Sequence, residues 1–132
     1  MEIRQIKESD FSMLDQWWLD HNMKIPDRKL LPHNGTGGFI VSIGKEDVAA
    51  GYLYFTNSSI AYSDFGISNV NYRNKEKRNK AMAYLLDYVF SLALKKGYTF
   101  TWATSKVSGV INKCKKLGYD INEGHTLIYK YK

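Results

Sequence analysis

Cysteine is almost missing from this 132-residue sequence, with Cys114 the single example. An internal disulfide is therefore excluded, which suits a reducing compartment. No apolar run approaches the roughly 20 residues that a membrane-spanning helix needs. The N-terminal sequence MEIRQIKESD also lacks the apolar stretch of a signal peptide. We expect a cytoplasmic protein without membrane association.

Several kinds of catalytic signature are absent as well. His21, His33 and His125 are scattered without the spacing of metal ligands, and Cys114 has no partner thiol. No Gly-x-Ser-x-Gly elbow and no P-loop occurs. We therefore expect neither a metal site nor covalent catalysis. Without repeats, low-complexity tracts or a linker, residues 1–132 are predicted to form a single domain.

Glycine is absent between Gly66 and Gly97, where a conspicuous cluster of cations lies. A strand from Ile60 leads into a loop that contains Arg73, Lys75, Lys77, Arg78 and Lys80 and opens a long apolar helix. Cations beside the free N–H groups of a helix N-terminus predict an anion site. Phosphate cradles normally use glycine for close backbone approach, so this site is either modified or lost. The alternative is a solvated basic helix start without a ligand.

The net charge of +6 conceals two unlike halves. Residues 1–72 hold six Lys/Arg and nine Asp/Glu, whereas residues 73–132 hold thirteen Lys/Arg and four Asp/Glu. This split suggests an anionic partner for the second half and a cationic one for the first. The alternative is that both halves have ordinary solvated charged faces.

The hydrophobic pattern predicts a mixed α/β sheet in the order β-α-βββ-α-β-α-β. The first helix follows Ser9-Asp10, and Phe11, Leu14 and Trp18 share one face of it. The second helix is predicted over Asn79–Lys96, and the third is capped by Ser105 or Ser108 and runs through Leu117. Both late helices are expected against the sheet. The predicted strands are 3–6, 39–43, 48–55, 60–67, 98–103 and 127–131.

Four segments together resemble the GNAT superfamily of N-acetyltransferases. These are the opening MEIRQIKESDF, the three-strand meander, the strand end Phe65-Gly66-Ile67-Ser68 with its basic loop and helix, and the late segment VINKCKKLGY. The chain is most similar to short acetyltransferase-like proteins of bacteriophages, through Gly51-Tyr52-Leu53-Tyr54, Thr56-Asn57-Ser58 and Ser68-Asn69. A phage origin would place it in the host cytoplasm.

The resemblance implies acetyl-CoA as co-substrate and direct transfer of its acetyl group to a primary amine. Backbone groups of Phe65 and Ile67 would polarise the thioester carbonyl. The family's pyrophosphate motif, Arg/Gln-x-x-Gly-x-Gly/Ala, aligns with Asn74, Lys77 and Asn79, so both glycines are replaced. Side-chain charge from Lys75, Arg78 and Lys80 would then take the place of close backbone approach.

For proton transfer, the resemblance points to Asp64 as the base and to Cys114 as the acid. Asp64 could instead be a surface carboxylate of the meander. Cys114 occupies the position where the family usually has a tyrosine, and it could equally be a small apolar filler. Asp20 and His21 are weaker candidates near the expected acceptor loops.

The expected acceptor is a small-molecule or protein amine, bound between the first helix, the loop 23–37 and the meander by a monomer or homodimer. The acidic first half favours a cationic amine. Two alternatives remain open at this point: a GNAT-fold phage accessory or structural protein without catalysis, and a basic module that binds nucleic acid with stacking tyrosines.

Overall fold

The computed structural model describes residues 1–131, whose elements follow most of the predicted order. Besides five strands and three α-helices, the chain forms short 3-10 helices at Glu8–Asp10, Arg28–Leu30 and Pro32–Gly35. The elements are β1 (Glu2–Gln5), α1 (Phe11–Asp20), β2 (Gly38–Ile43), β3 (Glu46–Phe55), β4 (Ile60–Ser68), α2 (Lys75–Lys95), β5 (Phe100–Ala103) and α3 (Ser108–Lys116).

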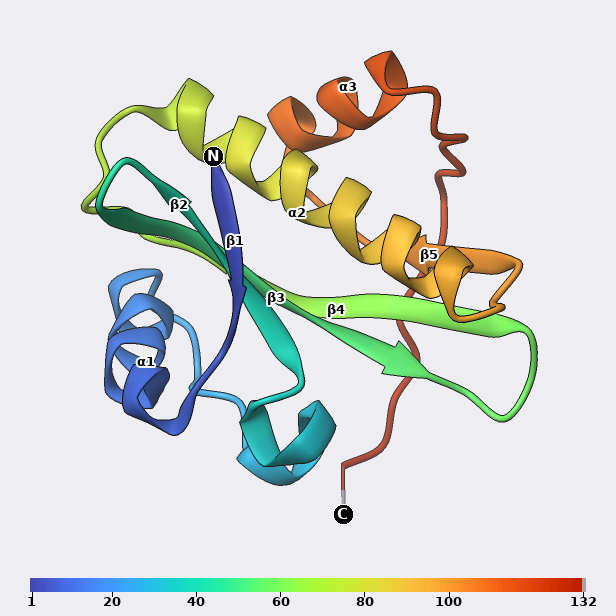
Figure 1. The fold of residues 1–132 in the computed structure, drawn as a ribbon, viewed down its shortest axis with the longest axis horizontal. Helices are drawn as coiled ribbons and strands as arrows, with labels where there is room; N and C mark the ends of the chain where they lie inside the picture. The colour runs from blue at the N-terminus through green and yellow to red at the C-terminus, as the bar shows by residue number, and fades with distance from the viewer. Residues whose placement is uncertain (132) are drawn as a thin grey trace.

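The strands form one sheet in the order β1-β2-β3-β4-β5 (Figure 1). The first four strands pair antiparallel, and β5 pairs parallel with β4 after the crossover through α2. The predicted mixed α/β sheet is therefore confirmed.

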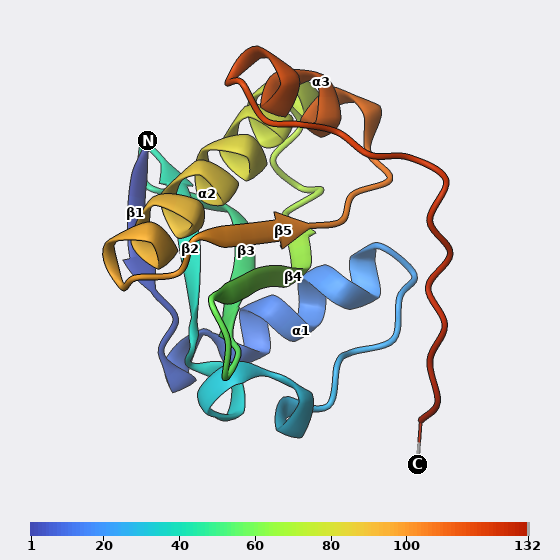
Figure 2. The same ribbon diagram turned by 90° about the vertical axis from the view of Figure 1, so that its right-hand side faces the viewer.

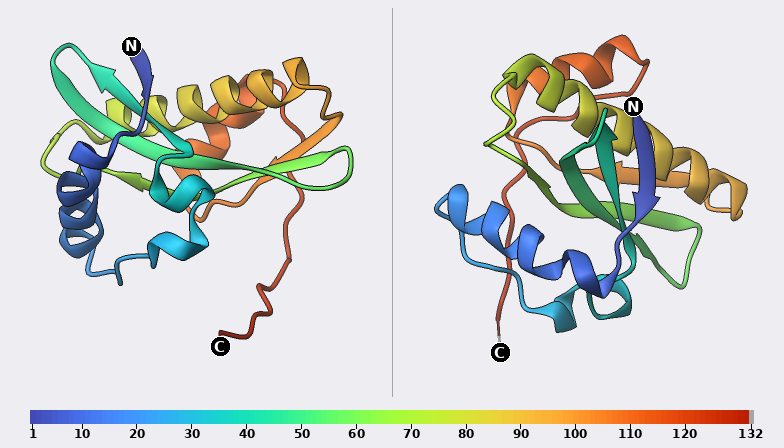
Figure 3. Two further views of the ribbon diagram at one scale, coloured as in Figure 1. Left: turned by 60° about the horizontal axis from the view of Figure 1, so that its bottom comes forward. Right: turned by 60° about the vertical axis from the view of Figure 1, so that its left-hand side comes forward.

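Helices cover the two faces of the sheet unequally (Figures 1 and 3). Because side chains alternate along a strand, Leu53 points to α2 and Tyr52 points to α1. The α2 side buries Leu85, Val89 and Ala93 of that helix. On the α1 side the most buried aromatic residue of the helix is Trp17, at 3% exposure, rather than the predicted Trp18.

Helix α2 begins at Lys75, four residues before the predicted Asn79. Asn74 is its N-cap, and the Asn74 side-chain oxygen accepts the Lys77 N–H at 3.1 Å. The cations predicted in a loop therefore occupy the first two turns of the helix. Helix α3 also starts differently: Val107 holds the N-cap position without a side-chain cap, and Ser105 accepts the Val107 N–H instead.

The predicted last strand, Leu127–Tyr131, is not formed. Residues 119–131 have no regular secondary structure, and Leu127 and Ile128 are 83% and 90% exposed. A strand needs a hydrogen-bonded neighbour and a buried face, and this segment has neither; it runs down one side of the molecule (Figure 2). Without a following strand, α3 packs on α2 rather than on the sheet, which corrects the prediction for this helix. No helix within residues 1–131 has the length and apolar character to cross a membrane.

Candidate active site

Strand β4 separates from β5 halfway along its length. The two strands pair from Ile60 with Phe100 to Ser63 with Ala103, and β5 then ends. Strand β4 continues to Ser68 with β3 on one side only. Residues 64–68 therefore have a backbone edge without a strand partner. Sequence could not reveal this separation, because it depends on where β5 stops.

The same half of β4 contains a β-bulge. Ala50 pairs with Ile67 and Tyr52 pairs with Asp64, so Phe65 and Gly66 together face Gly51. Phe65 adopts a φ of 54°, a left-handed conformation that is unfavourable for an aromatic residue. The strained residue of the bulge is Phe65 and not the neighbouring Gly66. Strain of this kind is concentrated at functional sites.

Asp64 stabilises the bulge and remains open to solvent. Its Oδ1 accepts the Phe65 N–H at 2.7 Å, and its side chain is exposed. Within residues 1–131 its Oδ2 has no hydrogen-bond partner. The predicted base therefore lies where β4 leaves β5, with one oxygen free to accept a proton.

The N-terminus of α2 offers donors that suit a diphosphate. The N–H groups of Lys75 and Glu76 have no partner within the part of the chain that the structure describes, because Asn74 caps only the Lys77 and Arg78 N–H groups. The side chains of Lys75, Lys77 and Lys80 are exposed. Two free N–H groups and three ammonium groups compensate in part for the missing glycines.

Two other predicted binding residues, Arg78 and Asn79, make contacts within the protein instead. The Arg78 guanidinium donates to the Tyr72 carbonyl oxygen at 2.6 Å and so fixes the β4–α2 connection. The Asn79 amide lies against α3, where a Cβ at Gly109 would be 2.2 Å from Asn79 Nδ2. Asn79 therefore sits where the two helices approach closely, and a side chain at position 109 would force the Asn79 amide to move.

Cys114 is packed between α2 and α3. It forms a buried cluster with Ala83 and Val110, and this burial raises the pKa of its thiol. Met82 contacts this cluster and also approaches Gly66 of the bulge. The environment is that of an apolar filler, one of the two interpretations of Cys114 given above. Its role as the proton donor stays a prediction.

The end of helix α1 contacts the end of strand β4. His21, at the end of α1, is half-buried and its Nε2 lies 2.9 Å from the Ser68 carbonyl oxygen. A carbonyl only accepts, so Nε2 carries the proton. Trp18 meets Phe65 edge to face at 6.4 Å between ring centroids. The helix is thereby attached to the unpaired half of β4, which shapes the α1 side of the bulge.

Three aromatic rings stack across the sheet beside Asp64. The Tyr54 and Tyr62 centroids are 4.7 Å apart with planes 2° from parallel, and the Tyr62 and Trp102 centroids are 5.0 Å apart at 16°. We call Tyr54, Tyr62 and Trp102 the aromatic ladder. The predicted strand 98–103 begins only at Phe100. Tyr98 precedes β5, belongs to the α2-side core and stacks on the exposed Phe55.

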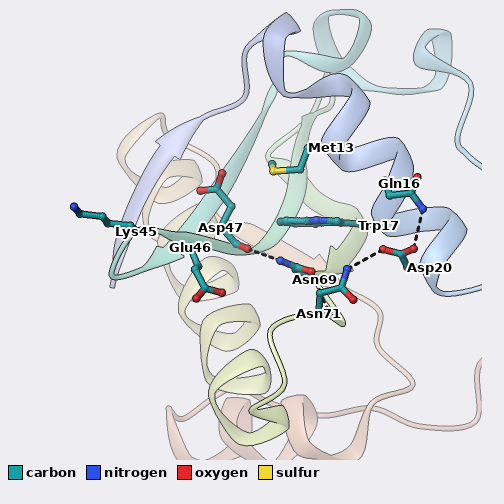
Figure 4. A pocket seen from close by; sticks show the side chains of 9 residues that line it. All are labelled: Met13, Gln16, Trp17, Asp20, Lys45, Glu46, Asp47, Asn69 and Asn71. Atoms are coloured by element: carbon teal, nitrogen blue, oxygen red, sulfur yellow. Dashed lines mark hydrogen bonds between the residues drawn. The ribbon is translucent and has the colours of Figure 1, made fainter.

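A separate cavity of about 430 Å³ lies between α1, the β2–β3 turn and the end of β4 (Figure 4). Its polar groups largely satisfy one another. Gln16 donates to Asp20 at 2.8 Å, Asn69 donates to the Asp47 carbonyl oxygen at 3.1 Å, and the Asp47 carboxylate binds Arg4 and Ser42. Asp20, a weaker candidate base, is therefore part of this cavity and not of the bulge region.

Compared with known proteins, the chain matches no protein-family model and no curated protein. Its fold does match solved structures. An aminoglycoside acetyltransferase from an uncultured soil metagenomic sample, in complex with sisomicin, superposes with a TM-score of 0.69 at 14% identity, over 99% of this chain and 95% of that one. The ribosomal-protein-S18-alanine N-acetyltransferase of Escherichia coli gives 0.67 at 12%, over 92% and 79%.

A third similar structure is the N-acetylglutamate synthase of Neisseria gonorrhoeae, complexed with coenzyme A and L-arginine. It gives a TM-score of 0.67 at 13% identity, with 92% of this chain matched to 28% of that larger one. At such identities the likeness shows the fold alone. The chain has the fold of the GNAT N-acetyltransferases.

Proposed function

We propose that the chain is an acetyl-CoA-dependent N-acetyltransferase, formed by one domain over residues 1–132. The observation that carries the proposal is the coincidence of three features at one place. Strand β4 leaves β5 at Asp64, and the bulge at Phe65 and Gly66 follows. The next helix begins with the free N–H groups of residues 75 and 76 and with lysine side chains in its first two turns.

Acetyl-CoA supplies the acyl thioester, whose carbonyl carbon forms a bond to the amine nitrogen as the bond to sulfur breaks. The N-terminal turns of α2 would hold the diphosphate through the first N–H groups and through Lys75, Lys77 and Lys80. Backbone groups of Phe65 and Ile67, on the unpaired edge of β4, would align the carbonyl, and the Phe65 N–H would exchange its bond to Asp64 for one to the substrate. The free Oδ2 of Asp64 would take the amine proton, directly or through a water.

Cys114 would return a proton to the departing thiolate, and two variants separate this role from packing. If Cys114 is the donor, Cys114→Ala lowers kcat without weakening acetyl-CoA binding, and Cys114→Ser restores part of the rate. If Cys114 only fills space, both variants lose stability and keep kcat.

The proposed acceptor is a cationic primary amine that reaches the bulge from the α1 side, in the cytoplasm, or in the host cytoplasm if a phage encodes the chain. The acidic first half of the sequence supports a cationic acceptor. The anion site, which is built from side chains and lacks glycine, supports the resemblance to phage proteins. The soil acetyltransferase that shares the fold was crystallised with the aminoglycoside sisomicin.

Binding and turnover are tested in that order. Acetyl-CoA should raise Tm by several degrees, and equimolar ATP should not. Thiol release from acetyl-CoA should then depend on an added amine. Equal stabilisation by ATP, or none by acetyl-CoA, would contradict the proposal and favour an inactive scaffold.

A further inference from the structure

The uncovered part of the α1-side face is aromatic. Ile60, Phe100 and Trp102 are 38%, 60% and 42% exposed there. Helix α1 covers the sheet only toward the other end (Figures 1 and 3). Tyr54 and Tyr62 complete this surface, and all five side chains lie on the strand segments that lead to Asp64.

The geometry of the aromatic ladder defines what can bind to it. Parallel rings with centroids 4.7 and 5.0 Å apart cannot lie side by side in one plane, so they stand on the sheet and face one another. Their edges therefore point away from the sheet. The Tyr54 hydroxyl at that edge donates to the Leu30 carbonyl oxygen at 2.8 Å, which leaves Tyr62 and Trp102 for a ligand. The outer face of Trp102, on the free edge of β5, has no stacking partner within residues 1–131. Ring edges and an open indole face both favour a further aromatic ring.

The ladder ends beside a single negative charge. Tyr62 and Asp64 are two residues apart on one face of β4, a spacing of about 7 Å. Asp64 is close enough for its charge to raise the pKa of Tyr54 further, after the larger effect of burial. The cations of α2 lie on the opposite face of the sheet, so this surface is unsuited to a polyanion such as nucleic acid.

We infer that the aromatic ladder and Asp64 select an arylalkylamine, a primary amine joined to a planar ring by an arm of two or three carbons. The inference rests on the proposed N-acetyltransferase function and specifies its acceptor. The ring packs on Tyr62 and Trp102, and the ammonium group pairs with the free Asp64 oxygen. The ammonium gives its proton to that oxygen or to a water, its lone pair forms the bond to the acetyl carbon, and the sulfur leaves with the electrons of the broken bond.

The test compares phenethylamine with hexylamine, which has the same charge but no ring. We expect kcat/KM to favour phenethylamine by about tenfold, mainly through KM, because aromatic contacts contribute on that scale. Trp102→Leu should abolish the preference. Phe55→Leu, an exposed aromatic on the opposite face of the same sheet, is the matched control and should leave it unchanged.

A binding measurement separates this inference from the proposed function. Saturation-transfer NMR with phenethylamine and free coenzyme A should show ring contacts that Trp102→Leu removes, whether or not turnover occurs. Equal kcat/KM for both amines with normal acetyl-CoA stabilisation would overturn the inference and leave the N-acetyltransferase function intact. Ring contacts that appear only after residues 125–131 are deleted would also overturn it, since the chain's own tyrosines would then fill the site. Failure of acetyl-CoA to bind would count against the function itself.

Discussion

The two faces of the sheet are organised by different chemistry. On the α2 side, the buried cluster is aliphatic, with Val48, Leu85 and Val89 almost fully buried, and aromatic rings pack only at its margin. On the α1 side, tyrosines and tryptophans are combined with ionic contacts, such as Arg4 with Asp10 at 2.7 Å. The closed face supplies most of the apolar stabilisation of the fold. The half-open face keeps polar groups and an uncovered area next to the bulge, which is where a substrate could be accommodated.

The largest effect on activity is expected at Asp64, on the half-open face, where a substitution should lower the rate without lowering stability. Asp64→Asn keeps an oxygen for the Phe65 N–H and removes the negative charge. The rate of acetyl transfer should fall by about 10²–10⁴-fold, the usual contribution of a general base. Steady-state thiol release at saturating acetyl-CoA measures this. An unchanged rate with an unchanged Tm would remove Asp64 from the mechanism.

On the closed face, substitutions should lower the stability of the fold more than those on the half-open face do. Leu85→Ala leaves a cavity under α2 and should lower the free energy of unfolding by about 2–5 kcal/mol. Trp102→Ala on the open face should cost less than half as much, because its side chain is 42% exposed. Urea unfolding of both variants is the measurement. Similar losses would mean that the ladder is part of the core.

The lysines in the first two turns of α2 should affect the affinity for acetyl-CoA and not the stability of the fold. Replacing Lys75, Lys77 and Lys80 together with Gln should weaken acetyl-CoA about tenfold at low salt and flatten its salt dependence. Calorimetric titration at two NaCl concentrations tests this. Lys95→Gln, at the far end of the same helix, is the control and should have no effect on affinity.

The smallest effect should come from the ion pair on the α1 side. The hydrogen bond from Arg4 holds the pKa of Asp10 below its usual value. A lowered folded-state pKa adds stability above the unfolded value of about 3.9 and loses it as the pH falls through the folded-state pKa. Asp10→Asn should therefore cost about 1 kcal/mol at pH 7. The difference in free energy of unfolding between Asp10→Asn and the unmodified chain should shrink near pH 3. A difference that stays constant with pH would show that the Arg4–Asp10 ion pair is not its cause.

Much of the sheet could be predicted because residues 39–43, 48–55 and 60–67 are apolar on one face or on both, as strands buried on one or both sides require. The predicted start of α2 is four residues late, because a run of charged residues resembles a loop although lysine and arginine are good helix formers and Asn74 is a good N-cap. The strand 127–131 was predicted from its own pattern, which carries no information about a pairing partner.

The candidate site was predictable only in its sequence neighbourhood. Phe65, Ile67 and the cations were identified, but the bulge, the end of β5 and the stacking of Tyr54 on Tyr62 all depend on strand register. Register is a property of two segments together, and a single segment does not define it. The same holds for Asn79, whose contact with Gly109 joins residues from two helices.

Phe65 also bears on how this protein could be improved. A left-handed phenylalanine costs about 1–2 kcal/mol that glycine at the same position would not. Phe65→Gly would relieve this strain but would also remove a half-buried ring that packs on Trp18 and the α1-side core, a loss that typically exceeds the strain. A laboratory selection for thermal survival should therefore keep this phenylalanine, and stabilising substitutions should be found elsewhere in the chain.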